Sequence, residues 1–308
     1  MKEHTFTFDS NDGLRIFVYA WYPATDVRGV IQISHGMAET AQRYRKFAQD
    51  ITTHGYIVYA NDHRGHGQTA QAVENLGYCG ENGFAAMVRD MRQLEQQIRR
   101  EHPTLPLFLL GHSMGSFLLQ QYLLDYPDND LTGAILSGSN GTTSLLKLTM
   151  GLAVAKHQRK KYGARTKSEP LNQLFFGRYG KRIALPRTSF DWLTRDESEV
   201  DRYIADPYCG FVCSTGFYYD FLQGLLTLSR SQRTLQIRKD FPLFIFSGQE
   251  DPVGIYGKGV LNLAKFYANY GLQDVVFRLY PGGRHEMLNE TNRDEVIRDL
   301  AAWLDAHI

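Results

Sequence analysis

Five residues near the middle of the chain form a motif typical of a serine nucleophile. Gly111-His112-Ser113-Met114-Gly115 matches the pattern G-x-S-x-G. The apolar run Leu107–Leu110 before it is strand-like, and Ser116–Tyr126 after it is helix-like and ends before a proline. A serine on such a tight strand-to-helix turn is exposed, and the helix N-terminus beside it favours developing negative charge. We therefore predict that Ser113 is a nucleophile, the alternative being an idle serine in a glycine-rich turn.

A serine hydroxyl is a poor nucleophile, so the chain must also supply a base within hydrogen-bond reach. Beyond residue 213 the histidines are His285 and His307. His307 is penultimate, where chain ends are expected to fray. His285 lies in a loop directly after the strand-like Val275–Tyr280, where the third member of a Ser, Asp, His series is expected. The order predicts His285 as the base, against the alternative of an exposed loop histidine.

The acid that orients this histidine is expected between the two, after another strand. Leu243–Ser247 is a strand-like run, and Gly248-Gln249-Glu250-Asp251-Pro252 follows it. Asp-Pro initiates turns, which favours Asp251, with the neighbouring Glu250 as its competitor and a plain turn as the structural alternative. Asp251 would hold the imidazole tautomer and stabilise its charged form without taking the proton.

A tetrahedral intermediate needs two backbone N–H donors for its oxyanion. One should come from the residue after the nucleophile, Met114, and the other from a loop after an early strand. The run Gly29–Ser34 is such a strand, and His35-Gly36-Met37 follows it, so Met37 is the second predicted donor. A simple strand-to-helix turn is the alternative for this segment.

A second polar loop, Asn61-Asp62-His63-Arg64-Gly65-His66-Gly67, follows the strand-like Tyr56–Ala60. His63 and His66 raise the question of a metal, but no third ligand cluster accompanies them. Hydrogen bonds that hold this loop beneath the site are the favoured interpretation, and His112 is expected to pack rather than to act as a base. We predict neither a metal nor an organic cofactor.

The elements around these motifs alternate between strand and helix. Short continuous apolar runs suit strands buried on both faces, and their alternation with helical segments such as Phe84–Glu101 predicts a parallel sheet covered by helices. A β-hairpin, Thr5–Phe8 and Leu14–Tyr22, comes first, and Glu295–His307 closes the chain as a helix. From about residue 140 to 213 no buried strand is recognisable, which predicts a helical insertion over the ligand-binding end of the sheet.

Composition excludes several classes of function. The chain has 308 residues, 43% of them hydrophobic and 22% charged, with a net charge of +1, so no basic field suggests nucleic acid. No apolar run reaches the length of a membrane-spanning helix, and the first residues do not resemble a signal peptide. Three cysteines without metal spacing fit a reducing compartment. A cytoplasmic protein with peripheral membrane contact is expected, and no motif indicates an oligomeric state.

The motifs together resemble the monoacylglycerol lipase and lysophospholipase branch of the α/β-hydrolases. They occur in family order: HGMAE (35–39), NDHRGHG (61–67), GHSMG (111–115), GQEDPV (248–253) and GGRHEMLNE (282–290). The resemblance implies a mostly parallel eight-stranded sheet with helices on both faces and an inserted helical cap. It implies Met37 and Met114 as oxyanion donors, and Glu39 and Arg43 near the glycerol end of the substrate. The family's further glycerol-contacting histidine is Leu288 here, a departure from the pattern.

The resemblance also divides the chain into a first core part (1–138), a helical cap (139–213) and a second core part (214–308). In the family the cap forms an apolar tunnel for an acyl chain, a role that Ser144–Ala155 and Phe175-Phe176 fit. The apolar cap helix and the basic residues after it also fit a membrane interface, the alternative being a helix that faces the core.

These observations predict a serine carboxylic-ester hydrolase whose substrate is a small amphiphilic ester, a monoacylglycerol or a lysophospholipid. A small-ester hydrolase or an aminopeptidase on the same fold is the alternative, and the acidic cluster Asp196-Glu197-Ser198-Glu199 leaves the second open. An epoxide hydrolase or dehalogenase would carry aspartate at position 113. A non-catalytic ligand receptor is disfavoured because all three members of the triad are in place.

Overall fold

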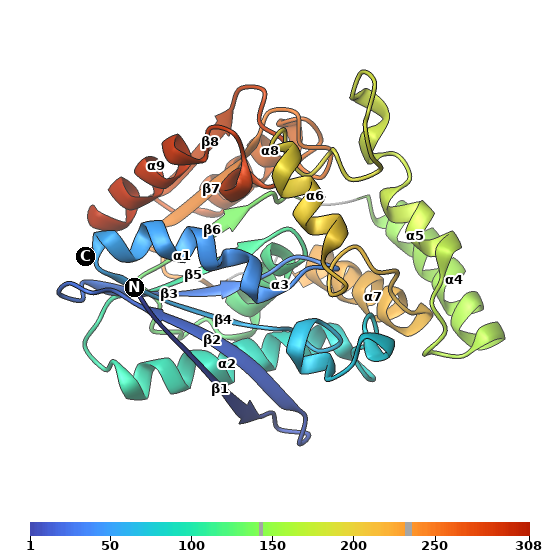
Figure 1. Ribbon diagram of the computed structural model, residues 1–308, viewed down its shortest axis with the longest axis horizontal. Coiled ribbons are helices and arrows are strands. Elements are labelled where there is room, and N and C mark those ends of the chain that lie inside the picture. Colours follow the sequence, from blue (N-terminus) through green and yellow to red (C-terminus); the bar gives the residue numbers. More distant parts are fainter. Residues whose placement is uncertain (142–143, 232–235) are drawn as a thin grey trace.

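The computed structural model describes residues 1–141, 144–231 and 236–308. An eight-stranded sheet runs through the middle of the molecule (Figure 1). The strand order is β1-β2-β4-β3-β5-β6-β7-β8. β2 pairs antiparallel with β1 and with β4, and every other neighbouring pair is parallel. The strands are β1 (Lys2–Asp9), β2 (Arg15–Tyr22), β3 (Gly29–Ser34), β4 (Tyr56–Asn61), β5 (Leu107–His112), β6 (Gly133–Ser137), β7 (Leu243–Gly248) and β8 (Val275–Tyr280).

Helices cover both faces of this sheet. The helices are α1 (Arg45–Ile51), α2 (Gly83–Glu101), α3 (Met114–Asp125), α4 (Leu145–Tyr162), α5 (Glu169–Phe176), α6 (Glu197–Ala205), α7 (Thr215–Ser231), α8 (Lys258–Tyr270) and α9 (Arg293–Asp305). The apolar residues of α1 and α9 belong to one core cluster, and those of α2, α3 and α8 belong to another on the opposite face. The predicted α/β fold, with a mostly parallel sheet between two helical layers, is confirmed.

The central strands show why their sequences are continuous apolar runs. In β5, Leu107 and Leu109 pack in the cluster with α2 and α3, whereas Phe108 and Leu110 pack in the cluster with α1 and α9. Successive side chains of a strand point to opposite faces, so both sets must be apolar when both faces are covered.

The last strand departs from this expectation. We interpreted Val275–Tyr280 as buried on both faces, but Val276 and Phe277 of β8 are exposed. β8 lies at the edge of the sheet and pairs only with β7, so helices cover it less completely than the central strands.

The segment between β6 and β7 carries α4, α5, α6 and α7 (Figure 1). Three of these helices fall between residues 139 and 213, and α7 follows them and packs against α4, α2 and α3. The basic residues after the apolar cap stretch continue α4 to Tyr162 and do not form a separate loop. The division into core and cap at residues 138 and 213 stays a prediction.

Candidate active site

The predicted nucleophile lies on a strained turn between β5 and α3. Ser113 has φ 51° and ψ −118°, a backbone conformation that residues with a side chain rarely adopt. Its N–H donates to the carbonyl oxygen of Ser137 at the end of β6 (2.9 Å), which fixes the turn against the neighbouring strand. The turn therefore has the strand-to-helix geometry that exposes a serine hydroxyl above the sheet.

Both glycines of the motif are required by close packing of the backbone. A Cβ at position 115 would lie 2.0 Å from the carbonyl oxygen of Ser34, and a Cβ at position 111 would lie 2.5 Å from the carbonyl oxygen of Gly115. Contacts this short do not occur in real structures, so only glycine fits. As a result the end of β3 abuts the start of α3, and the loop after β3 lies next to the nucleophile turn.

This contact places the two segments that carry the predicted oxyanion donors next to each other. Met114 is the first residue of α3, so its N–H has no acceptor within the helix. On the other segment, the carbonyl oxygen of Gly36 accepts a hydrogen bond from His35 Nδ1 (2.7 Å). Because a trans peptide is planar, that bond also fixes the direction of the Met37 N–H, which points away from His35. The Gly36 N–H is held in turn by Glu39 Oε1 (2.5 Å).

The polar loop after β4 supports this arrangement. His35 Nε2 accepts from the backbone N–H of His63 (3.0 Å), so the neutral ring must carry its proton on Nδ1. Burial lowers the pKa of His35 to about 4 and that of His66 to about 3, which keeps both rings neutral. His63 Nε2 lies 3.0 Å from Ser34 Oγ. These bonds match the expectation that the loop is held beneath the site. Within the described ranges, no group of three His, Cys, Asp or Glu residues is arranged to hold a metal ion.

The predicted base and acid form a buried pair. His285 Nδ1 lies 3.0 Å from Asp251 Oδ1, and both side chains are almost completely buried. Asp251 accepts further hydrogen bonds from Ser247 Oγ (2.6 Å) and from the N–H of Val253 (2.8 Å). The competitor Glu250 is exposed. The structure therefore pairs Asp251 with the imidazole, as the sequence analysis expected.

The charges of this pair reinforce each other. Burial acts to raise the pKa of Asp251, but the His285 charge and the three hydrogen bonds together hold it below the ordinary value. Burial likewise acts to lower the pKa of His285, and Asp251 reverses the shift, so the pKa lies above the ordinary value. An ionised carboxylate thus stabilises the imidazolium that proton transfer from a serine would create.

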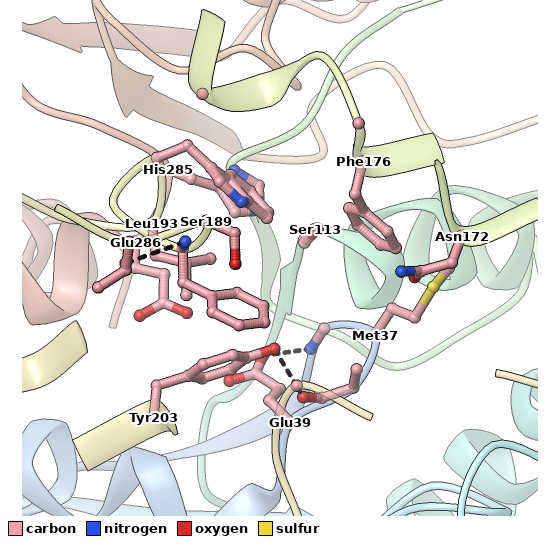
Figure 2. Close-up of a pocket in the computed structure, with 18 of the residues that line it drawn as sticks. Met37, Glu39, Ser113, Asn172, Phe176, Ser189, Leu193, Tyr203, His285 and Glu286 are labelled. Carbon is pink, nitrogen blue, oxygen red and sulfur yellow. Dashed lines mark hydrogen bonds between the residues drawn. The ribbon is translucent and has the colours of Figure 1, made fainter. Parts of the chain in front are cut away.

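His285 and Ser113 both lie beside the end of β6. The Ser113 N–H is bonded to Ser137, and the next residue, Gly138, has φ 57° and leaves no room for a side chain, since a Cβ there would lie 2.8 Å from His285 Cε1. Both Ser113 and His285 line one cavity of about 460 Å³ (Figure 2). The other histidine, His307, is not frayed as expected, because its ring nitrogens bond Asp274 Oδ2 (2.8 Å) and the Trp303 carbonyl oxygen (2.6 Å).

Two buried carboxylates that share an arginine form part of the wall of this cavity. Arg43 donates from Nη1 and Nη2 to the two carboxylate oxygens of Glu286 (2.6 Å each) and from Nη1 to Glu39 Oε2 (2.8 Å). Burial would raise the pKa of Glu286, but Arg43 lowers it to about 2, so this carboxylate is ionised. Glu39 and Glu286 line the cavity, whereas Arg43 lies behind them and lines a small adjacent pocket with Leu288.

Elsewhere the cavity wall is largely aromatic and apolar, and much of it comes from the segment between β6 and β7. The apolar lining residues include Met37, Phe176, Phe190, Trp192, Leu193 and Phe211. Phe176 thus lies where the predicted acyl tunnel would be, but Phe175 packs on Tyr218 and Phe221 instead. No residue of α4 lines the cavity, so the expectation that Ser144–Ala155 contributes to the tunnel is wrong. That helix packs on α7, away from Ser113.

Three contributors to the site escaped the sequence analysis. Glu286 follows the predicted base directly, and only its pairing with Arg43 distinguishes it from a surface residue. Ser247 ends the strand before the predicted acid and bonds it. Trp192 covers His285 with a ring-centroid distance of 5.1 Å. Glu286 and Ser247 could have been noticed because they lie next to the motifs that carry His285 and Asp251. No local pattern points to Trp192.

Comparisons with known proteins agree with this geometry. A family model described as "Serine aminopeptidase, S33" matches residues 25–292. A monoacylglycerol lipase of Mycolicibacterium smegmatis is 30% identical over 312 residues, covering 100% of this chain and 98% of the relative. A monoglyceride lipase of Rattus norvegicus is 27% identical over 300 residues, covering 96% and 89%.

A solved structure gives the same result for the fold. A thermostable carboxyl esterase from Bacillus coagulans, in complex with glycerol, has a TM-score of 0.90 at 28% identity, covering 100% of this chain and 99% of that one.

None of the helices in the described ranges combines the length and apolar character needed to cross a bilayer.

Proposed function

Since the chain belongs to the serine aminopeptidase S33 family and is a serine hydrolase of its monoacylglycerol lipase branch, we propose that it cleaves the fatty-acyl ester bond of monoacylglycerols or lysophospholipids. Hydrolysis of lipid esters is the activity its relatives support. The observation that carries the proposal is the cavity. Ser113 and His285 line it together with aromatic side chains such as Phe176 and Phe190 and with the carboxylates of Glu39 and Glu286.

The proposed reaction proceeds through an acyl-enzyme. His285 accepts the proton of the Ser113 hydroxyl as its oxygen attacks the ester carbonyl carbon, and the N–H groups of Met37 and Met114 bind the oxyanion. His285 then gives the proton to the leaving alcohol as the ester C–O bond breaks. A water molecule deprotonated by His285 attacks the acyl-enzyme, and the fatty acid leaves as Ser113 regains its proton. Asp251 stays ionised throughout.

The mixed lining of the cavity suits an amphiphilic ester. An acyl chain placed along the aromatic wall buries apolar surface, which contributes about 25 cal/mol per Å². The carboxylate oxygens of Glu39 and Glu286 can accept hydrogen bonds from alcohol hydroxyls. Arg43, already bonded to both, is proposed to hold them in place and not to touch the substrate itself.

A substrate panel tests this proposal. We expect turnover of monoacylglycerol or lysophosphatidylcholine with kcat/KM rising with chain length in a series of p-nitrophenyl esters, because a longer chain buries more of the aromatic wall. Aminoacyl amides should be poor substrates. Preference for aminoacyl amides, or for acetate esters over all longer chains, would contradict the lipid assignment. Comparing the two lipids at equal concentration below their aggregation limits decides between the head groups.

The acidic cluster that left the aminopeptidase alternative open does not supply an anchor for a substrate amino terminus, because Asp196 caps α6 and Glu199 pairs with Lys46 and Arg202. The carboxylates that do line the cavity, Glu39 and Glu286, are already paired with Arg43. None of the four residues Asp196–Glu199 lines the cavity.

We also propose that α4 meets the membrane from which such substrates come. Its outward face exposes Leu146 (70%), Met150 (62%) and Val154 (46%) at helical spacing. Lys160 and Lys161 are exposed at the end of the same helix, and no acidic residue occurs between positions 145 and 168. An exposed apolar stripe beside basic residues favours binding to anionic lipid surfaces.

The double variant Leu146→Ser/Met150→Ser is therefore expected to bind phosphatidylglycerol-rich vesicles at least about tenfold more weakly, since each buried CH₂ contributes about 0.8 kcal/mol. Co-sedimentation with vesicles measures the loss. Phe277→Ser is the matched control, because Phe277 is also exposed but lies on the sheet edge at β8. Equal vesicle binding by the double variant and the wild type would contradict the proposal.

A further inference from the structure

A short stretch of the segment between β6 and β7 is bonded directly to the loop that carries the proposed base. We call Asp191–Arg195 the cap strap and Pro281–Glu290 the histidine loop. Hydrogen bonds join the two segments as follows: Glu286 N–H to the Leu193 carbonyl oxygen (2.7 Å), Arg284 Nη1 to the carbonyl oxygens of Asp191 (2.6 Å) and Thr194 (3.0 Å), Thr194 Oγ1 to the Asn289 carbonyl oxygen (3.0 Å), and Arg195 Nε to Glu290 Oε2 (2.9 Å).

These bonds hold the centre of the cap strap over the imidazole. The indole of Trp192 lies 5.1 Å from the His285 ring, with 39° between the ring planes. On other sides the imidazole meets Gly138, where a Cβ would clash with it, and His112, whose ring lies 4.7 Å away. Trp192 is itself fixed by Phe176 (6.0 Å) and Tyr179 (4.8 Å). Phe176 lines the cavity together with Ser113 (Figure 2).

We propose that Trp192 is a positioning residue for the hydrolysis reaction, and that the cap strap bonded to the histidine loop keeps its indole against the imidazole of His285. This inference rests on the triad proposed above. A single hydrogen bond to Asp251 fixes Nδ1 but leaves the ring free to swing about it. A flat indole on one side, opposed by neighbouring groups on the others, restricts that swing and keeps water from the ring.

The contact has a consequence for how the cap can move. Any opening that lifts the cap strap from the histidine loop would break the bonds of Arg284 and Arg195 and would uncover His285. The part of the cap strap next to the base therefore stays in place during turnover, and substrate must enter past other parts of the cavity rim.

Replacing Trp192 tests the proposal with a soluble substrate, p-nitrophenyl butyrate, so lipid specificity plays no part. Trp192→Ala is expected to lower kcat by about 10²-fold, the size of effect that misplacement of a catalytic group produces, and to change KM much less, because the short butyryl chain covers little of the cavity wall. Trp192→Phe, which keeps a flat ring, should restore most of the activity. Trp192→Leu keeps apolar volume without an aromatic face and serves if the alanine variant does not fold.

The acid limb of the pH profile of kcat/KM supplies a readout that a purely structural role would not move. It reports the protonation of His285 in the free enzyme. Three carboxylates near His285 raise the pKa of its imidazole: Asp251 has the largest effect, followed by Glu286 and Glu39. The remaining titratable neighbour, His112, is neutral. All are retained in the variant. Burial opposes the charged form, so uncovering the ring raises the pKa of His285, and the limb shifts to higher pH.

Ile183→Ala is the matched control, because Ile183 packs in the same apolar cluster of the cap but does not line the cavity. Rates are expressed per competent site, counted by fluorophosphonate labelling carried to completion. The proposal is overturned if Trp192→Ala has wild-type kcat per labelled site, or if its acid limb coincides with that of Ile183→Ala. Because Ser113→Ala tests the triad separately in the same assay, failure of this inference is distinguishable from failure of the proposed function.

Discussion

Ser113→Ala is expected to lower kcat for ester hydrolysis by about 10⁶-fold, the loss seen when the nucleophile of a serine hydrolase is removed. The variant cannot form an acyl-enzyme, because the residues of the turn offer no second hydroxyl in the position that φ 51° gives to this one. Hydrolysis of p-nitrophenyl butyrate measures the loss, and mass spectrometry after treatment with a fluorophosphonate should show one adduct on the wild type and none on the variant.

Ser116→Ala is the control for this experiment. Ser116 lies one turn along α3, is fully buried, donates to the carbonyl oxygen of Ser113 (2.6 Å), and lies within hydrogen-bond distance of Ser139 Oγ (2.7 Å). Its loss removes a hydroxyl from the same helix end but no proposed reacting group, so labelling should persist. Ester turnover in Ser113→Ala equal to that of Ser116→Ala would refute the proposed mechanism.

The central strands were predictable because burial on both faces leaves a strong local signal. Gly29–Ser34 was delimited correctly, since every residue of β3 is buried and turn residues follow it. The opposite holds for β8, whose bounds were correct but whose exposure was not, because position at the edge of a sheet depends on strand order and not on local sequence. Helices α1 and α8 were not anticipated from their short apolar patterns.

The pairing of His285 with Asp251 was predictable from chain order, since each of them follows a recognisable strand. What the sequence could not show is how distant segments meet. Arg43 and Glu286 are 243 positions apart, and Arg284 bonds the carbonyl of Asp191 across 93 positions. Such pairs have no periodicity to reveal them. The two predicted substrate contacts, Glu39 and Arg43, came from family resemblance, and the structure places only the first on the cavity wall.

Asp251→Asn is expected to lower kcat by about 10²- to 10⁴-fold, the range that general acid–base catalysis contributes, equivalent to about 3–5.5 kcal/mol of transition-state stabilisation. Oδ1 of Asp251 faces two donors, His285 Nδ1 and the Val253 N–H, whereas Oδ2 faces the hydroxyl of Ser247. An asparagine can place its oxygen at the first position and its NH₂ group toward Ser247, whose hydroxyl rotates to accept. The imidazole tautomer is then kept and only the negative charge is lost, so the variant isolates the charge of the acid.

The pH profile of kcat/KM for Asp251→Asn tests whether the carboxylate charge of Asp251 acts on His285. Asp251 raises the pKa of His285, so its removal lets burial lower that pKa, and the acid limb of the residual kcat/KM moves to lower pH. Glu250→Gln is the matched control: it removes the neighbouring carboxylate, which is exposed, and should leave both rate and limb unchanged. If Glu250→Gln lost activity and Asp251→Asn kept it, the acid would have to be reassigned to Glu250. The buried pairing of His285 with Asp251 predicts the reverse, since a carboxylate facing water is too well solvated to stabilise an imidazolium formed inside the protein.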